Sequence, residues 1–251
     1  MRYIARFNHI AMNANLLSYH KITDRMDFGI TTRTLRDFRS DVALIGSLPD
    51  DQRPDFCFDD GYEDTFTNAF PILSEFGFTA NLFIITGLLG KFNSWDFTFF
   101  GTFKHLSRQQ VKALSDAGWN IGSHTKSHLA LTTLSPSLLR AELLDSKKFL
   151  EDLLGKAVTS ISFPFGNFNA RVLDACKEAG FQEAISIKKS SPDGFVKRSK
   201  AVYRFDSLNS IRAKLRNAPL ELLRLRTINA CSGATIFMHK LKGYRPIHHA
   251  E

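Results

Sequence analysis

The sequence has few cysteines and no long hydrophobic run. Its three cysteines, Cys57, Cys176 and Cys231, are far apart and odd in number. This spacing gives neither a disulfide framework nor the Cys-x-x-Cys pairs of a zinc-binding module. No apolar run approaches the roughly 20 residues that span a bilayer, and Asn and His interrupt the basic N-terminal stretch, which therefore lacks the apolar core of a signal peptide. The sequence predicts a cytoplasmic protein, and it leaves peripheral contact with a membrane open.

Tryptophan and tyrosine are also scarce, with 2 Trp and 5 Tyr against 23 Phe among 251 residues. Hydrophobic residues make up 43% and charged residues 23%, which is an ordinary globular composition. The net charge of +8 would suit acidic glycans, anionic lipids or nucleic acid. However, the basic residues are scattered and accompany no nucleic-acid-binding motif. We therefore expect a single domain over residues 1–251 that does not bind nucleic acid.

A repeated pattern of helix, glycine and short apolar run begins near residue 54. Ser107 and Gln110 form a capping box, and a helix that starts at Ser135-Pro136 stops at Gly155. The expected helices are 65–76, 107–118, 135–155 and 170–179, and the expected strands are 79–86, 119–123, 157–163 and 183–187. Short strands that are apolar on both faces and alternate with helices predict a parallel sheet.

The connecting segments carry two further expectations. The polar stretch 188–200 is interpreted as a loop. The stretch 88–104 is interpreted as an insertion, which either walls an active site or packs as a surface loop. Polar residues cluster at the C-terminal ends of several strands, which favours a distorted (β/α) barrel over an open sheet.

Two adjacent carboxylates, Asp59 and Asp60, follow an apolar strand and precede Gly61. Burying them is costly unless a cation compensates the charge, although a plain turn also explains an Asp-Asp-Gly sequence. His124 and His128 follow another strand, and two histidines four apart converge on one cation if their segment is helical. One carboxylate and two imidazoles form a ligand set that leaves positions open for water and substrate.

Two other strand ends offer weaker signals. The stretch 162–166, Ser-Phe-Pro-Phe-Gly, has no titratable side chain but can present backbone N–H groups to an oxyanion. A last apolar strand, 234–239, ends at His239, which is either a packing residue or a general acid.

Taken in order, these segments resemble the motifs of the polysaccharide deacetylase family, also called the NodB-homology or carbohydrate esterase family 4 domain. The first motif is similar to 58–61, Phe-Asp-Asp-Gly, the second to 123–128, Ser-His-Thr-Lys-Ser-His, and the third to 163–166, Phe-Pro-Phe-Gly. The likeness begins at 17–20, Leu-Ser-Tyr-His, which is similar to the family's first strand, and extends at least to Ile187.

The resemblance implies a hydrolase that removes acetyl groups from N-acetylated amino sugars and releases acetate. A divalent metal, with zinc as first choice and cobalt or nickel as substitutes, would be held by Asp60, His124 and His128. Asp59 would be the base toward the attacking water, and His239 would protonate the leaving amine. The residues implied to contact substrate are Pro164, Phe165, whose amide would face the oxyanion, and Phe237, which would line the acetyl pocket.

Three departures from the family pattern leave alternatives open. Ser162 stands where many members have an arginine, no Asp-Trp pair occurs near 186–194, and His239 is followed by Lys240 in place of an aspartate. The same residues could serve an O-acetyl carbohydrate esterase, or a glycan-binding pseudoenzyme that keeps its metal.

Overall fold

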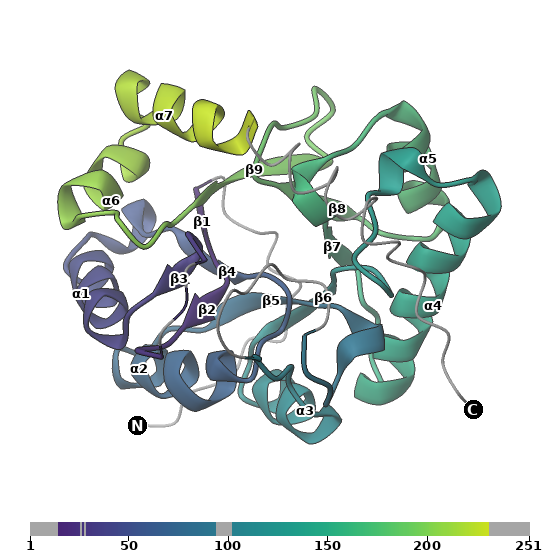
Figure 1. The fold of residues 1–251 in the computed structure, drawn as a ribbon, viewed down its shortest axis with the longest axis horizontal. Coiled ribbons are helices and arrows are strands. Elements are labelled where there is room, and N and C mark those ends of the chain that lie inside the picture. The colour runs from purple at the N-terminus through teal and green to yellow at the C-terminus, as the bar shows by residue number, and fades with distance from the viewer. Residues whose placement is uncertain (1–14, 26, 28, 94–101, 231–251) are drawn as a thin grey trace.

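Seven short parallel strands form a closed barrel, and helices surround it (Figure 1). The computed structural model describes residues 15–25, 27, 29–93 and 102–230. β1 pairs with both β4 and β9, and this pairing closes the ring. The barrel strands, in spatial order, are β1 (Leu16–Tyr19), β4 (Asp55–Phe58), β5 (Ala80–Ile84), β6 (Asn120–Ser123), β7 (Ser160–Ser162), β8 (Glu183–Ser186) and β9 (Val196–Ala201). The expected (β/α) barrel is confirmed.

Alternating side chains divide the strands between two cores. Leu16, Cys57, Phe83 and Ile185 come from four strands and form a small buried cluster of their own. Their neighbours along the same strands, such as Leu17, Phe56 and Leu82, point the other way and belong to the larger core under the helices. Cys57 thus packs as a small hydrophobic residue. Because every strand is parallel to its neighbours, all C-terminal ends open on one mouth of the barrel.

The helices begin and end at capping residues that the sequence shows. Ser107 and Gln110 complete the expected capping box of α3. The Ser135 side chain caps α4, and Gly155 ends it in the left-handed conformation. The α-helices are α1 (Leu35–Gly46), α2 (Phe70–Glu75), α3 (Arg108–Asp116), α4 (Pro136–Leu154), α5 (Ala170–Glu178), α6 (Leu208–Leu215) and α7 (Pro219–Ala230).

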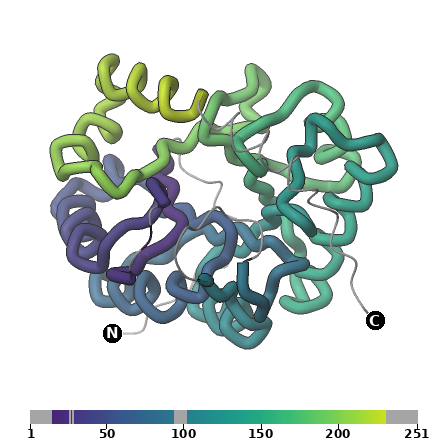
Figure 2. The backbone as a smooth tube through the Cα atoms, in the orientation of Figure 1, coloured from purple at the N-terminus to yellow at the C-terminus, as the bar shows by residue number. Residues whose placement is uncertain are grey.

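Two smaller features lie at the rim of the barrel. β2 (Lys21–Ile22) and β3 (Thr32–Arg33) form a separate two-stranded sheet directly after β1. At the other end of the described chain, Asn229 in α7 donates a hydrogen bond to the carbonyl of Ile187, just beyond β8, at 2.8 Å. Figure 2 shows the chain passing around the ring, from the purple N-terminal strands to the yellow-green α7.

Two expectations need correction. The helix expected over 65–76 is a π-helix, Thr65–Ala69, followed by α2, because Pro71 has no N–H to donate and its ring disfavours a regular α-helical turn before it. The loop expected over 188–200 ends early, since β9 begins at Val196 and pairs with β8 and β1. Within the described residues, no helix is long and apolar enough to span a bilayer.

Candidate metal centre

Asp60 leaves the end of β4 in a left-handed turn. Its φ is 71°, and Gly61 follows with the same value. A Cβ added at Gly61 would lie 2.9 Å from Ile84 Cδ1, so glycine meets both the backbone conformation and the close approach to β5. Aspartate tolerates this conformation better than most residues. The turn places the Asp60 carboxylate, which is only 4% exposed, at the mouth of the barrel.

His124 and His128 converge through a left-handed turn and not through a helix. The segment after β6 has no helical assignment, and Thr125 and His128 have φ values of 67° and 55°. The Ser123 hydroxyl accepts a hydrogen bond from the Thr125 amide, and the Thr125 hydroxyl accepts one from the His128 amide. The expected convergence is therefore confirmed, but its helical basis is wrong.

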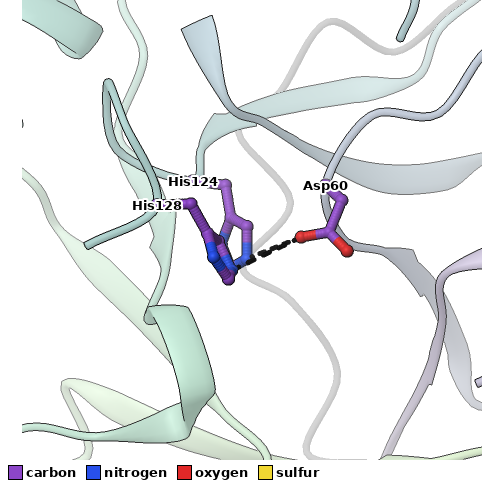
Figure 3. Close-up of side chains that lie close together, drawn as sticks. All are labelled: Asp60, His124 and His128. Carbon is purple, nitrogen blue, oxygen red and sulfur yellow. Dashed lines mark ion pairs between the residues drawn. The ribbon is translucent and has the colours of Figure 1, made fainter. Parts of the chain in front are cut away.

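Asp60, His124 and His128 come together as one buried cluster (Figure 3). Asp60 Oδ1 lies 3.3 Å from His124 Nε2 and 3.5 Å from His128 Nε2. One ligand atom of each residue lies within 4.8 Å of the others. The fold thus brings together the one carboxylate and two imidazoles that the sequence predicts as metal ligands.

Opposing effects set the pKa values of this cluster. Burial favours the neutral form of Asp60, but contact with His124 and the charges of His128 and His20 outweigh it and hold the Asp60 pKa well below its usual range. Burial lowers the pKa of His124, but Asp60 and Asp59 more than compensate and raise it. The site therefore favours a carboxylate beside positive charge.

The donor set fits a divalent cation. His124 Nδ1 lies 2.8 Å from the Ser162 carbonyl oxygen, which can only accept a hydrogen bond. In a neutral His124 ring the hydrogen therefore sits on Nδ1, and the lone pair of Nε2 faces Asp60. Metal-binding histidines are commonly oriented in this way, because the nitrogen that does not bind the metal donates to a second residue. Asp60 Oδ1 is buried and has no hydrogen-bond partner among the described residues. A cation would give this oxygen the partner that the surrounding residues do not supply.

Glu142 of α4 supports the loop between the two histidines. Its Oε2 accepts hydrogen bonds from the amides of Lys126 at 3.0 Å and Ser127 at 2.8 Å. Burial raises the pKa of Glu142, although these hydrogen bonds act in the opposite direction. The sequence did not predict this role, because an acid inside an amphipathic helix has no local signature of a loop clamp.

The Pro164-Phe165 pair lies next to the cluster. Phe165 has a φ of 59°, and its ring meets the His128 ring edge-on with centroids 4.8 Å apart. A Cβ at Gly166 would lie 2.7 Å from Ile187 Cγ1, so the chain passes close to the end of β8. The structure therefore places the segment expected to bind substrate beside the Asp60–His124–His128 cluster. The roles of the Phe165 amide and of Pro164 remain predictions.

Asp59 and His20 face the barrel mouth from adjacent strands. In the register of β1 and β4, Ser18 pairs with Cys57, and the Asp59 amide donates to the Tyr19 carbonyl at 3.0 Å. Side chains alternate along a strand, so His20 and Asp59, each two residues further, point to the same side. Asp59 Oδ1 and His20 Nδ1 are both buried without a hydrogen-bond partner in the described parts of the chain.

His20 is the site residue that sequence reasoning missed. The resemblance places 17–20 on a first strand and gives the proton-donor role to His239. His20 shares with Asp59 and His124 the feature that identifies them in the sequence, a polar residue directly after an apolar strand. His239 and Phe237 lie outside the described residues, so the structure tests neither assignment.

The sequence profile of the polysaccharide deacetylase family matches residues 50–184, just over half of the chain. The chain belongs to the polysaccharide deacetylase family. The matched stretch contains Asp59, Asp60 and both clustered histidines, whereas His20 and His239 lie outside it. Family membership, as expected from the motifs, is confirmed.

Two curated relatives resemble part of the chain. YxkH of Bacillus subtilis is 33% identical over 131 residues, which cover 52% of this chain and 43% of YxkH. A poly-beta-1,6-N-acetyl-D-glucosamine N-deacetylase of Staphylococcus aureus is 28% identical over 143 residues, which cover 53% of this chain and 47% of that protein. These matches span less than half the length of either relative.

Solved structures share the fold. The Streptococcus pyogenes deacetylase PplD, in complex with acetate, superimposes with a TM-score of 0.67 at 19% identity, over 80% of this chain and 97% of that one. IcaB from Ammonifex degensii gives a TM-score of 0.66 at 16% identity, over 82% and 97%. The barrel is thus the fold of known deacetylases.

Proposed function

We propose that the chain is a metal-dependent hydrolase that removes acetyl groups from N-acetylated amino sugars of a poly- or oligosaccharide. The observation that carries this proposal is the buried Asp60–His124–His128 cluster, with Asp59 and His20 at the same barrel mouth. The staphylococcal relative supports an N-acetylated glycan as substrate, since its name describes an N-deacetylase of such a polymer.

Asp60, His124 and His128 would hold the metal, and zinc is the metal that we propose. Ligand atoms about 2.0–2.1 Å from a shared tetrahedral zinc lie about 3.3–3.5 Å apart. The Asp60 oxygen lies 3.3 and 3.5 Å from the two imidazole nitrogens. Cobalt and nickel accept the same mixed nitrogen and oxygen donors and are the substitutes that we expect.

When bound, a divalent cation supplies Lewis-acid polarisation of the acetyl carbonyl and a lower pKa for water. Asp59 accepts a proton from the attacking water as the new carbon–oxygen bond forms. The Phe165 amide donates a hydrogen bond to the oxyanion. The carbon–nitrogen bond then breaks, and a protonated side chain gives its proton to the leaving amine, so that the products are acetate and a free amino sugar.

We assign this last proton to His20. The register of β1 and β4 places its side chain on the same side of the barrel as Asp59, and its Nδ1 is buried without a hydrogen-bond partner among the described residues. His239 is the competing candidate. His20→Ala should reduce kcat by about 10²–10⁴-fold while metal stays bound, and His239→Ala should leave kcat within about tenfold of the wild type. The opposite pattern would return the role to His239.

The activity is tested by acetate release from a panel of substrates. We expect release from N-acetylglucosamine oligosaccharides, its loss with a chelator, and its return with zinc. Faster release from O-acetylated xylan would identify an O-acetyl esterase. Binding to N-acetylated oligosaccharides with no acetate release under any metal would identify a pseudoenzyme, and full activity in chelator would refute the metal mechanism.

A further inference from the structure

His105 belongs to the segment between β5 and α3 and lies against the turn that carries Asp60. The Leu106 amide donates to the Gly61 carbonyl at 2.9 Å, and the Glu63 amide donates to the Lys104 carbonyl at 2.8 Å. Tyr62 and His105 pair as an antiparallel bridge between these two hydrogen bonds. The backbone on both sides of His105 is therefore fixed to the residues directly after Asp60.

The His105 side chain reaches the backbone of Asp60. Its Nδ1 lies 3.0 Å from the Asp60 carbonyl oxygen, and the residue is 1% exposed. Because a carbonyl oxygen only accepts, Nδ1 carries the hydrogen and donates it. The ring also stacks on Tyr62, with centroids 4.8 Å apart and planes 24° apart. Two contacts of the imidazole can therefore be separated by substitution, the stacking on Tyr62 and the hydrogen bond to the Asp60 carbonyl.

Asp60 has a specific need for such a donor. A non-glycine residue in the left-handed region is strained and persists only where its surroundings hold it. Asp60 has a φ of 71°, and its Oδ1 has no hydrogen-bond partner among the described residues. Besides its ion-pair contacts with His124 and His128, the carboxylate takes its direction from the backbone, and His105 fixes the peptide plane after Asp60 at its carbonyl.

We propose that His105 is a positioning residue for the metal site. Its Nδ1–H holds the Asp60 carbonyl and thereby aims the carboxylate at His124 and His128. This inference rests on the proposed metal-binding function of Asp60. It adds His105, which none of the sequence motifs contains, to the residues that set the geometry of the site.

Two substitutions separate the two contacts. His105→Phe keeps a ring to stack on Tyr62 but removes the donor. His105→Asn removes the ring, while its amide nitrogen takes a position close to that of Nδ1 and can still donate. The zinc affinity of the full chain is measured by competition with a chromophoric chelator, and thermal unfolding is measured separately in excess chelator.

We expect His105→Phe to weaken zinc binding by about 10–100-fold, the usual effect of losing a residue that orients a metal ligand. His105→Asn should stay within about threefold of the wild type in zinc affinity although it unfolds at the lower temperature of the two. If His105 had a purely structural role, the variant with the lower unfolding temperature would also be the variant with the weaker zinc affinity. If His105→Phe does not fold, His105→Leu takes its place with the same expected loss of affinity.

Other outcomes would overturn the proposal. Zinc affinity of the Phe variant equal to that of the wild type, or an Asn variant as weak as the Phe variant, refutes the positioning role alone. A wild-type chain that binds no zinc, cobalt or nickel refutes the proposed metal site, and with it this inference. The wild-type titration therefore distinguishes the two failures.

Discussion

Replacing Glu142 by leucine should loosen the loop that carries both histidines. The carboxylate of Glu142 accepts the amides of Lys126 and Ser127 at 3.0 and 2.8 Å. Leucine has a similar volume but accepts no hydrogen bond, so both amides lose their acceptor. His128, at the end of this loop, has a φ of 55° and therefore depends on its surroundings to hold its conformation.

The magnitude follows from the two hydrogen bonds. A buried donor left without a partner costs about 1–3 kcal/mol, so two cost about 2–6 kcal/mol of unfolding free energy. Asp145 provides the matched control, since it also lies on α4 and its carboxylate contacts Lys126 Nζ at 2.8 Å. Its side chain is 46% exposed, and such a surface ion pair contributes under about 1 kcal/mol.

Urea unfolding in excess chelator measures this effect without any contribution from metal. We expect Glu142→Leu to lose at least about 2 kcal/mol and Asp145→Leu to lose less than about 1 kcal/mol. Zinc affinity should fall in the first variant and stay near the wild-type value in the second. Equal unfolding free energies for the two variants would show that Glu142 does not clamp the loop.

Two further predictions concern buried charge elsewhere in the barrel. Arg33 donates two hydrogen bonds of 2.8 and 2.7 Å to Asp41 in the interior, so Asp41→Ala should cost about 3–5 kcal/mol in urea unfolding. Glu75→Ala breaks an exposed ion pair with Arg39 and should cost far less, because surface ion pairs contribute little to stability. Similar losses in the two variants would refute the role of the buried pair. Burial raises the pKa of Asp64 to about 7, although the Ile22 backbone and the charges of Lys21 and Arg25 act in the opposite direction. A carboxyl whose pKa is higher in the folded than in the unfolded protein loses its stabilising effect as pH rises, here between about pH 4 and 7, so Asp64→Asn should gain up to about 4 kcal/mol over the wild type at pH 8 and almost nothing at pH 4. An equal difference at both pH values would contradict this prediction.

Local signals in the sequence predicted much of the barrel. The capping box at Ser107, the Ser135–Gly155 bracket and the apolar runs 79–86 and 183–187 depend on short-range chemistry, and the structure confirms an element at each. β9 was missed because Val196–Ala201 carries three basic residues, and only its pairing with β8 and β1 makes it a strand. The π-helix before α2 was hidden for a similar reason, since apolar periodicity does not distinguish it from an α-helix.

The site divides in the same way. Asp60, His124 and His128 were predictable because each follows a strand, and parallel strands end at one mouth. His105 and Glu142 were not, because their contacts to the ligand loops join segments that are distant in sequence. His20 also directly follows an apolar strand, but the sequence offers His239 at the end of another apolar run as a second possible proton donor.

The two neighbouring aspartates provide the most direct test of the proposed metal mechanism. Asp60 clusters with His124 and His128. The Asp59 side chain follows the alternation of β4 and points, like that of His20, to the inside of the barrel. We therefore assign metal binding to Asp60 and the base to Asp59. Asparagine at 59 keeps the shape of the side chain but cannot accept the proton.

The decisive measurement is zinc stoichiometry together with acetate release for both variants. Asp59→Asn should retain about one zinc per chain and lose turnover by about 10²–10⁴-fold. Asp60→Ala should lose zinc first, with partial activity restored by excess metal. An Asp59→Asn variant without zinc beside an Asp60→Ala variant that keeps it would reverse the two roles, and unchanged turnover in both would contradict the deacetylase mechanism.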